Sequence, residues 1–377
     1  MKILVSVTLN GRSAGTWYAV ETARRFQSRG HDVLCLPRPQ GKTIAIARKA
    51  GLRVLDDCDL GATTVGTFYP HIRRLIRLAR EYEPDVILAH WGTDHLLWAM
   101  AKTMGRLAIP LVRVRALDPR PPNKHLFSRW LHRSPTDHVV TVNSRLFEAY
   151  RKRLRLPRER LSVITAGVEA SDCEGRESAD LASLGVPAGK TVVVLLARFS
   201  PVKGHRVLLK SIRTVVDRLP DVHFLWLGFP SEYNRDLFAR WFVEANLTEQ
   251  ITVVDEFVPD VHAVLRSCAL GLVTSIGSES VSRSLLEYLS CGLPVVATDV
   301  GGVTDLMQRG DFGMLVPPDD SPALADAIIR ILESPDRGAA QGERGRSYAS
   351  KQGTWDQRID EWEDLLAKLR VQNQSSP

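Results

Sequence analysis

The sequence lacks the features of a membrane-spanning or exported protein. None of its apolar runs approaches the roughly 20 residues that a spanning helix needs, and the apolar start MKILVSVTLNG is too short for a signal peptide. The five cysteines are odd in number, scattered and never spaced as C-x-x-C. We therefore expect reduced thiols, without a disulfide framework or a zinc site, and a cytoplasmic protein. The cysteines are Cys35, Cys58, Cys173, Cys268 and Cys291.

Two ligand motifs are also missing. The turn Asn10–Gly15 does not contain a complete G-x-G-x-x-G, so a tightly held dinucleotide is not expected there. Asp57 and Asp59 form a carboxylate pair, but two acids without a third ligand nearby are few for a hard cation. We therefore predict no metal site and no bound cofactor.

The remaining composition is that of an ordinary globular protein, 44% hydrophobic and 25% charged. A chain of 377 residues exceeds what one hydrophobic core usually supports, which predicts two domains. A polar stretch of low periodicity marks a linker at 171–188. The predicted domains are therefore 1–170 and 189–350, followed by a C-terminal helix and tail at 351–377.

Strands and helices alternate in both halves, which predicts doubly wound α/β sheets. A helix is expected from about Thr16 to Arg29. The expected strands are Lys2–Val7, His31–Leu36, Pro84–Ala89, Leu111–Arg115, Asp137–Val142, Leu161–Thr165, Thr191–Ala197, Val222–Gly228, Ile251–Asp255 and Val295–Thr298.

Residues 274–305 hold the densest chemistry in the chain. Glu279 and Glu287 are separated by seven residues, and Ser280 and Ser282 supply possible N-cap oxygens for a helix that ends before Gly292. Free N–H groups at a helix start attract an anion, so the stretch suits a phosphorylated sugar. Each glutamate alone is equally well explained as an ordinary capping or solvated helix residue.

Two further strand ends carry candidate ligand groups. Arg198 and Lys203 lie in a turn just past Thr191–Ala197, where a planar guanidinium and a compact ammonium suit a diphosphate. An ordinary basic turn is the alternative. His90 follows Pro84–Ala89 at the edge where α/β sheets bind ligands. A structural histidine, or His95 on the following helix, are the alternatives there.

The segment from Glu279 to Glu287, followed by SCGLPVVATDVGG, resembles the E-x7-E region of the retaining glycosyltransferases of family 4. It also resembles bacterial cell-envelope and lipopolysaccharide core glycosyltransferases. The resemblance implies a GT-B fold, in which two Rossmann-like domains face a central cleft and the C-terminal helix crosses back to the first domain. The chain departs from the usual Phe-Gly of that region, with Val281-Ser282 followed by Arg283.

The resemblance also implies roles for individual residues. Glu279 would face the donor sugar, His90 would lie near the reacting sugar, and both are the expected catalytic residues. Glu287 would accept from the ribose diol, and Gly15 would lie near the donor phosphate. The expected donor-binding residues are Gly15, Arg198, Lys203, Ser280, Val281, Ser282 and Glu287. The implied enzyme is a metal-independent hexosyltransferase, with a nucleotide diphosphate sugar as donor and retention of anomeric configuration.

The positive charge of the chain is concentrated in 111–160, with thirteen Arg and Lys against four Asp and Glu, a net charge of +9. Phe127 and Trp130 interleave with Arg129 there, and arginines on the helical stretch 72–80 add a second basic face. We therefore expect peripheral contact with an anionic membrane and a glycolipid acceptor of the cell envelope. The predicted acceptor or membrane residues are Arg113, Arg115, Arg129 and Trp130.

Three alternatives remain open at this point. The basic surface has no partner, or the chain is a catalytically silent protein that binds nucleotide sugars, or it is a basic nucleic-acid-binding protein. The segment 111–160 does not have the aromatic spacing of a nucleic-acid stacking platform. We therefore do not expect a nucleic-acid partner.

Overall fold

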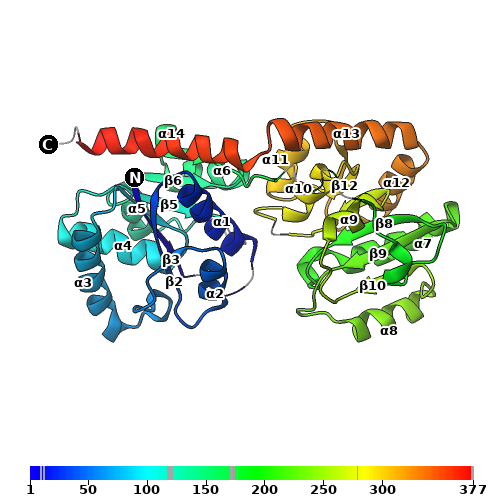
Figure 1. Cartoon of the computed structure of the whole chain (residues 1–377), viewed down its shortest axis with the longest axis horizontal. Helices are drawn as coiled ribbons and strands as arrows, with labels where there is room; N and C mark the ends of the chain where they lie inside the picture. The colour runs from blue at the N-terminus through cyan, green and yellow to red at the C-terminus, as the bar shows by residue number, and fades with distance from the viewer. Residues whose placement is uncertain are drawn as a thin grey trace. The chain divides into compact units, whose positions relative to one another are not determined.

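The computed structural model describes residues 1–8, 11, 13–116, 122–169, 173, 175, 177–277 and 279–374. The predicted turn residues Asn10 and Arg12, the basic-segment residues 117–121, parts of the predicted linker and Ser278 lie outside the described residues. The chain divides into two compact units (Figure 1). The N-terminal unit comprises Met1–Ala166 with the C-terminal segment from Trp355, and the C-terminal unit comprises Gly167–Thr354.

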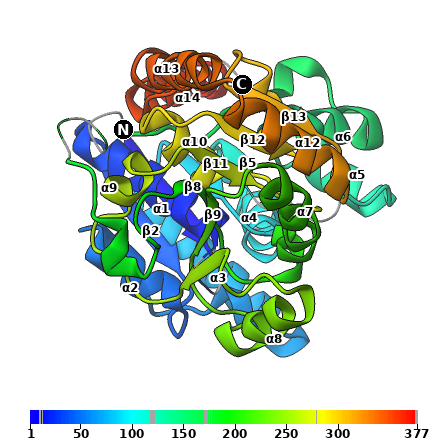
Figure 2. The same cartoon turned by 90° about the vertical axis from the view of Figure 1, so that its right-hand side faces the viewer.

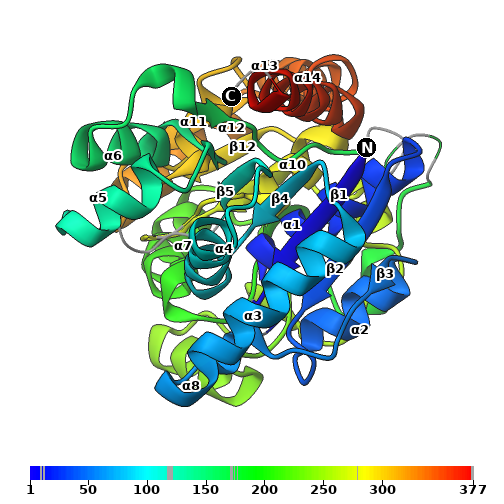
Figure 3. The ribbon, with the colours of Figure 1, turned by 90° about the vertical axis from the view of Figure 1, so that its left-hand side faces the viewer.

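The N-terminal unit is built on a parallel sheet whose strands β1, β2 and β4 are mostly apolar, as expected where helices cover both faces (Figure 3). In the described residues the strand order is β3-β2-β1-β4-β5-β6-β7, which reverses between β1 and β4. The strands are β1 (Lys2–Val7), β2 (Asp32–Pro37), β3 (Arg53–Val54), β4 (Val86–Ala89), β5 (Leu111–Arg115), β6 (His138–Thr141) and β7 (Leu161–Val163).

The helices of this unit are α1 (Ala14–Ser28), α2 (Lys42–Lys49), α3 (Val65–Tyr82), α4 (Gly92–Gly105), α5 (Leu126–Arg133), α6 (Ser144–Leu154) and α14 (Trp355–Gln374). The C-terminal helix α14 packs on α1. The Trp362 indole N–H donates to the Tyr18 hydroxyl at 3.2 Å, and Tyr18 donates to the Ile164 carbonyl at 2.8 Å. Trp362 and Tyr18 are fully buried, so the last helix is part of the core of the first unit.

The C-terminal unit has a second parallel sheet, with the order β10-β9-β8-β11-β12-β13 in the described residues (Figure 2). Residues of α7, α8 and α12 share one hydrophobic core with the sheet. The strands are β8 (Thr191–Leu196), β9 (Val222–Leu227), β10 (Ile251–Val254), β11 (Leu270–Val273), β12 (Val295–Thr298) and β13 (Gly313–Val316). The helices are α7 (His205–Arg218), α8 (Arg235–Ala245), α9 (Val261–Arg266), α10 (Arg283–Ser290), α11 (Gly302–Met307), α12 (Ser321–Leu332) and α13 (Pro335–Lys351).

All ten predicted strands are confirmed to within two residues at each end, while β3, β11 and β13 of the described residues were not among them. One helix start differs from the prediction. Helix α1 begins at Ala14 because Ser13 accepts from the Thr16 N–H at 3.1 Å, which places Gly15 inside the first turn. Helix α10 begins at Arg283 with Ser282, one of the two predicted N-cap residues, as its N-cap, and Glu279 lies in the loop that precedes it.

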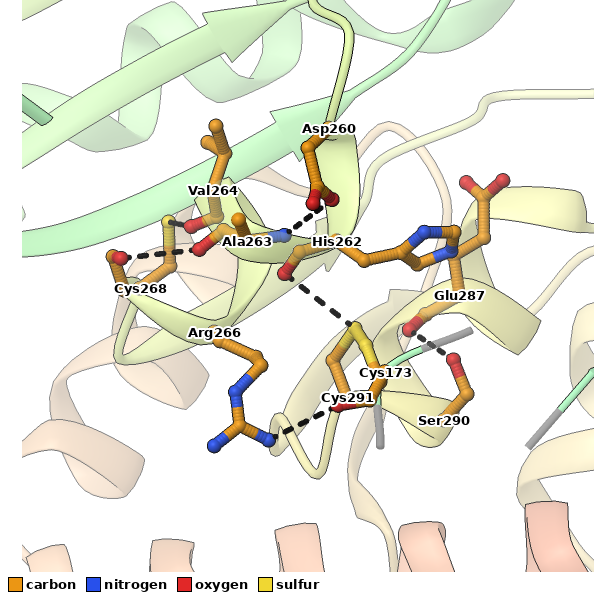
Figure 4. Close-up of a disulfide and its surroundings, with 11 residues drawn as sticks. Cys173, Asp260, His262, Ala263, Val264, Arg266, Cys268, Glu287, Ser290 and Cys291 are labelled. Carbon is orange, nitrogen blue, oxygen red and sulfur yellow. Dashed lines mark hydrogen bonds between the residues drawn. A yellow bond between two sulfur atoms is a disulfide. The ribbon is translucent and has the colours of Figure 1, made fainter. Parts of the chain in front are cut away.

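The expectation that every cysteine is a reduced thiol is wrong for Cys173 and Cys291, which form a disulfide in the C-terminal unit (Figure 4). The two residues are 118 positions apart, and their Cα atoms are 5.2 Å apart. Only the fold brings them together, so their spacing in the sequence gave no signal. The bond joins the segment just after the crossover into this unit to the C-cap of α10, the helix that carries Glu287. In the described part of the chain, no helix is long and apolar enough to cross a membrane.

Candidate functional site

Three neighbouring strands of the C-terminal unit bring the predicted donor-site residues to one edge of the sheet. Strands β8, β11 and β12 are adjacent, and because they are parallel their carboxyl ends lie at the same edge. Arg198 and Lys203 follow β8, the loop with Glu279 follows β11, and Gly301-Gly302 follows β12. Ligands of open α/β sheets bind at such carboxyl edges.

Lys203 and Glu279 form an ion pair at this edge. The Glu279 side chain is 4% exposed and the Lys203 side chain 23%. The same Glu279 oxygen, Oε1, accepts a hydrogen bond from the Ser275 hydroxyl at 2.6 Å. A buried carboxylate needs such partners because it has left water. The two predicted donor-site residues are therefore already in contact with each other.

Two glycines allow the backbone around Glu279 to pack closely. Gly301 has a φ of 54°, and a Cβ there would lie 2.3 Å from the Glu279 carbonyl oxygen. Gly204 has a φ of 70°, and a Cβ there would lie 1.8 Å from the Thr274 carbonyl oxygen. The Gly302 N–H donates to the Glu279 carbonyl at 2.7 Å. The loop is thus held in a conformation that only glycine permits at these contacts.

The start of α10 is lined by small buried residues. Ser280, Val281 and Ser282 are 7%, 7% and 6% exposed. Ser282 is the N-cap, but its hydroxyl makes no hydrogen bond to the helix, nor to any other described residue. The N–H groups of a first helical turn and a buried hydroxyl without a partner suit an anionic ligand group.

Helix α10 is fixed to the sheet by Tyr288, which the sequence analysis did not identify. Its hydroxyl accepts from the Leu196 N–H at 2.7 Å and donates to the Leu272 carbonyl at 3.1 Å. Its ring occupies the space that a side chain at Gly271 would need. Glu287, one residue earlier, is 8% exposed and accepts from Arg283 Nε at 2.8 Å. Through Tyr288, the position of Glu287 is therefore set by strands β8 and β11, which are followed by the loops with Lys203 and Glu279.

His90 lies at the carboxyl end of β4 in the N-terminal unit, as predicted, and is 3% exposed. Neither ring nitrogen has a hydrogen-bond partner among the described residues. Burial, with a smaller contribution from the positive charge of Arg113, lowers the pKa of His90 to about 3. The imidazole is therefore neutral near pH 7. The hydroxyls of Ser6 and Thr8, at the carboxyl end of β1, are also buried and without a partner in the described chain.

The predicted acceptor residues fall into two groups. Arg113 is 2% exposed inside β5 and donates to the Ala89 carbonyl at 3.1 Å, so its predicted place on a membrane-facing surface is wrong. Arg115 is half-buried at the end of the same strand. Arg129 and Trp130 are half-buried in α5, where Trp130 lies beside the exposed Phe127 with ring centroids 5.6 Å apart.

Asp57 and Asp59 do not form a joint cation site. Asp57 forms an ion pair with Arg74, while Asp59 accepts from the N–H groups of Gly61 and Ala62 and lies 3.3 Å from Arg38. Among the residues that the structure describes, no group of three or more potential metal ligands occurs.

The structure thus assembles Arg198, Lys203, the 279–282 loop and Glu287 in one unit, and Gly15, His90, Arg113 and Arg115 in the other. Sequence reasoning missed Ser275 and Tyr288 in the first group and Asp94 in the second. Asp94 is fully buried four residues after His90. An acidic residue in the first turn of a helix is a weak signal, because it is ordinarily only a cap.

Comparison with known families matches most of the chain, in two segments. Residues 15–172 match the family described as Glycosyltransferase Family 4, and residues 190–334 match the family described as Glycosyl transferases group 1. A D-inositol 3-phosphate glycosyltransferase of Thermobispora bispora is 26% identical over 380 residues, covering 89% of this chain and 85% of the relative. The Corynebacterium glutamicum enzyme of that name is 30% identical over 200 residues, 51% of this chain and 48% of the relative. The chain spans about half the length of most curated relatives that it matches.

Solved structures match almost the full length of the chain, and two of them serve as examples. The crystal structure of Anabaena HepE in complex with UDP and glucose has a TM-score of 0.80 at 20% identity, over 98% of this chain and 100% of that chain. A glycosyltransferase from Rickettsia africae has a TM-score of 0.86 at 16% identity, over 98% of both chains. At such identities the likeness shows the fold alone. It confirms the predicted fold class, with two Rossmann-like units and a C-terminal helix that returns to the first.

Proposed function

The chain belongs to the glycosyltransferases of family 4, and from that premise we propose that it transfers a hexose from a nucleotide diphosphate sugar to an acceptor hydroxyl, with retention of anomeric configuration. The C-terminal unit binds the donor and the N-terminal unit binds the acceptor. No covalent nucleophile is required in this proposal. The catalytic residues are Glu279 and His90.

The observation that carries the proposal is the Lys203–Glu279 pair at the carboxyl edge of β8 and β11. A nucleotide diphosphate sugar offers both residues a better partner. Its diphosphate takes the Lys203 ammonium, and its sugar hydroxyls donate to the Glu279 carboxylate that Lys203 leaves. Arg198, half-buried after β8, adds a planar donor pair for phosphate oxygens.

The proposed reaction relies on positive charge that is already in position before the bond to the leaving group breaks. As the bond to the leaving diphosphate breaks, negative charge grows on its oxygens, and Arg198 and Lys203 lie at the edge where it forms. Two cations supply this stabilisation without a metal ion or another cofactor. Ser280, Val281, Ser282 and the start of α10 contribute N–H and hydroxyl donors to the phosphates.

His90 has two buried ring nitrogens without partners among the described residues, and such groups are costly unless a ligand or water completes them. In the proposed reaction a sugar hydroxyl provides that partner. Because its pKa is lowered to about 3, His90 acts as a neutral imidazole that orients a hydroxyl, and its nitrogens donate or accept according to tautomer.

The acceptor we propose is an anionic glycolipid of the cell envelope, such as a lipopolysaccharide core, reached from an anionic membrane surface. Helix α5 supports this, since Leu126 is 81% and Phe127 55% exposed beside Arg129 and Arg133. A soluble phosphorylated polyol is the second candidate, and it is favoured by the inositol phosphate glycosyltransferases among the relatives.

A thermal-shift panel of nucleotide diphosphate sugars tests donor binding. A matching donor at a hundred times its dissociation constant stabilises the protein by about 2.7 kcal/mol. The matched control is a Lys190→Met variant, which alters an exposed ion pair at the other end of the sheet. If no nucleotide sugar raises the midpoint, the proposal is wrong. If one does but no acceptor stimulates nucleotide release, the chain is a silent binding protein.

A further inference from the structure

We propose that Asp94 and Arg113 are positioning residues that together hold His90 in place for the reaction. The inference rests on the proposed function, because it gives His90 a role in sugar transfer. It goes further by assigning a task to a buried charge pair that neither the family resemblance nor the comparisons mention.

The two side chains hold the backbone on both sides of His90. Before it, Arg113 Nη1 donates to the Ala89 carbonyl at 3.1 Å. After it, the Asp94 carboxylate accepts from the Trp91 N–H at 2.8 Å and from the His95 N–H at 3.1 Å. The His90 N–H itself donates to the Ser6 carbonyl of β1 at 3.0 Å. The peptide groups next to the imidazole are therefore fixed from three directions.

The pair is also electrostatically coupled at the reaction edge. Asp94 is 0% and Arg113 2% exposed. Burial raises the pKa of Asp94 to about 7, while Arg113 and the backbone N–H groups of Trp91, His95 and Thr8 lower it. Arg113 in turn donates a hydrogen bond to the hydroxyl of Tyr150 on α6. Removing the charges of Asp94 and Arg113 from water costs free energy, and a buried pair of this kind is weak evidence for stability. A functional reason for the pair is therefore needed.

That reason is the position of Asp94 at the point where the strand order reverses, between β1 and β4. Its carboxylate accepts from the N–H groups of Thr8, which follows β1, and of Trp91, which follows β4, while Arg113 contacts the end of β4 from the neighbouring strand β5. The carboxyl edge of an α/β sheet binds its ligands there. Asp137 offers a contrast in the same unit. Its carboxylate also accepts from a backbone N–H, that of Leu111 at 2.7 Å, and it pairs with Lys102, but at the amino end of β5. Asp137 therefore has the same structural task without access to His90.

The test is a kinetic double-mutant cycle between Asp94→Asn and His90→Ala, with Asp137→Asn as matched control. We expect D94N to lower kcat about 10- to 100-fold, because small displacements of a reacting group have effects of this size. The KM for the donor stays within about twofold, since the donor is held by the other unit. In the H90A background, D94N changes kcat by less than about twofold, because residues that act as one unit are not additive.

Tyr150→Phe provides a milder second variant in case D94N does not fold. It removes one partner of Arg113, and it should lower kcat severalfold in the wild-type background and not in H90A. If D94N and Y150F reduce kcat no more than D137N does, or reduce it equally with and without His90, the pair is only structural and the inference is overturned. If H90A itself leaves kcat unchanged, the proposed role of His90 fails, and the inference fails with it.

Discussion

Replacing Lys203 by Met tests whether the Lys203–Glu279 pair both stabilises the fold and takes part in donor binding. The variant leaves the Glu279 carboxylate, 4% exposed, with the Ser275 hydroxyl at 2.6 Å. Removing one partner of a fully buried ion pair costs about 3–5 kcal/mol. Because Lys203 is 23% exposed and Ser275 remains, we expect about 2–3 kcal/mol.

Differential scanning calorimetry measures this loss. For a unit of this size, 1 kcal/mol corresponds to about 2–4 °C, so K203M should lower the transition midpoint by about 4–12 °C. The double variant K203M/E279Q should recover more than half of the loss, since a neutral amide no longer needs the cation. It should not recover turnover, because the phosphate still lacks its cation.

The control is again K190M, where the ion pair with Asp221 at 3.4 Å is exposed and worth less than about 1 kcal/mol. If K203M is no less stable than K190M, the pair does not form in solution. A stable K203M with normal turnover would refute both the contact and its role in donor binding.

Four further predictions follow from the same structure. Glu287→Gln should weaken donor binding by about 1.5–3 kcal/mol in calorimetric titration while the fold is kept, and unchanged affinity would make Glu287 an ordinary helix residue. Alkylation of the denatured, unreduced protein should label three cysteines rather than five, and Cys173→Ser should lower the free energy of unfolding by about 2–5 kcal/mol relative to Cys58→Ser. The protein should sediment with anionic and not neutral liposomes, salt should release it, and Phe127→Glu should weaken the binding; no preference for anionic lipid would favour a soluble phosphorylated acceptor. The free energy of unfolding should fall as the pH drops from 6.5 to about 4, because the histidines of the unfolded chain bind protons that the buried, neutral histidines of the folded protein do not. Asp94, whose pKa is raised in the folded protein, contributes in the opposite sense. A free energy of unfolding that does not change with pH would contradict the burial of His90, His132, His138 and His205.

The strands of both units were predictable because apolar runs in a doubly wound sheet are long, continuous and bounded by turns. The grouping of Glu279, Ser280 and Ser282 in one loop was predictable for a local reason. Glu279, its serines and the glycines that follow lie within one short stretch of sequence, so a single motif carries the geometry. Ser282, one of the two predicted N-cap residues, is the N-cap of α10, although its side chain makes no capping hydrogen bond.

The contacts that the sequence could not reveal join residues far apart in the chain. Arg113 reads as part of a basic surface, because LVRVR alternates like a half-exposed strand. The structure covers both faces of β5, so the Arg113 guanidinium is buried. Asp94 on α4 and Tyr150 on α6 stabilise its positive charge there. The Cys173–Cys291 disulfide was missed for the same reason, since its two halves share no local pattern.

Acceptor-dependent transfer tests the central claim most directly. A donor found by thermal shift is incubated with the acceptor, nucleoside diphosphate release is followed, and the anomeric proton of the product is assigned by NMR. We predict release that requires acceptor, a product with the anomeric configuration of the donor, no effect of EDTA, and a loss of about 100-fold or more in Arg198→Ala and Glu279→Gln. An inverted product, activity that EDTA abolishes and Mg²⁺ restores, or full turnover in the two variants would contradict the account.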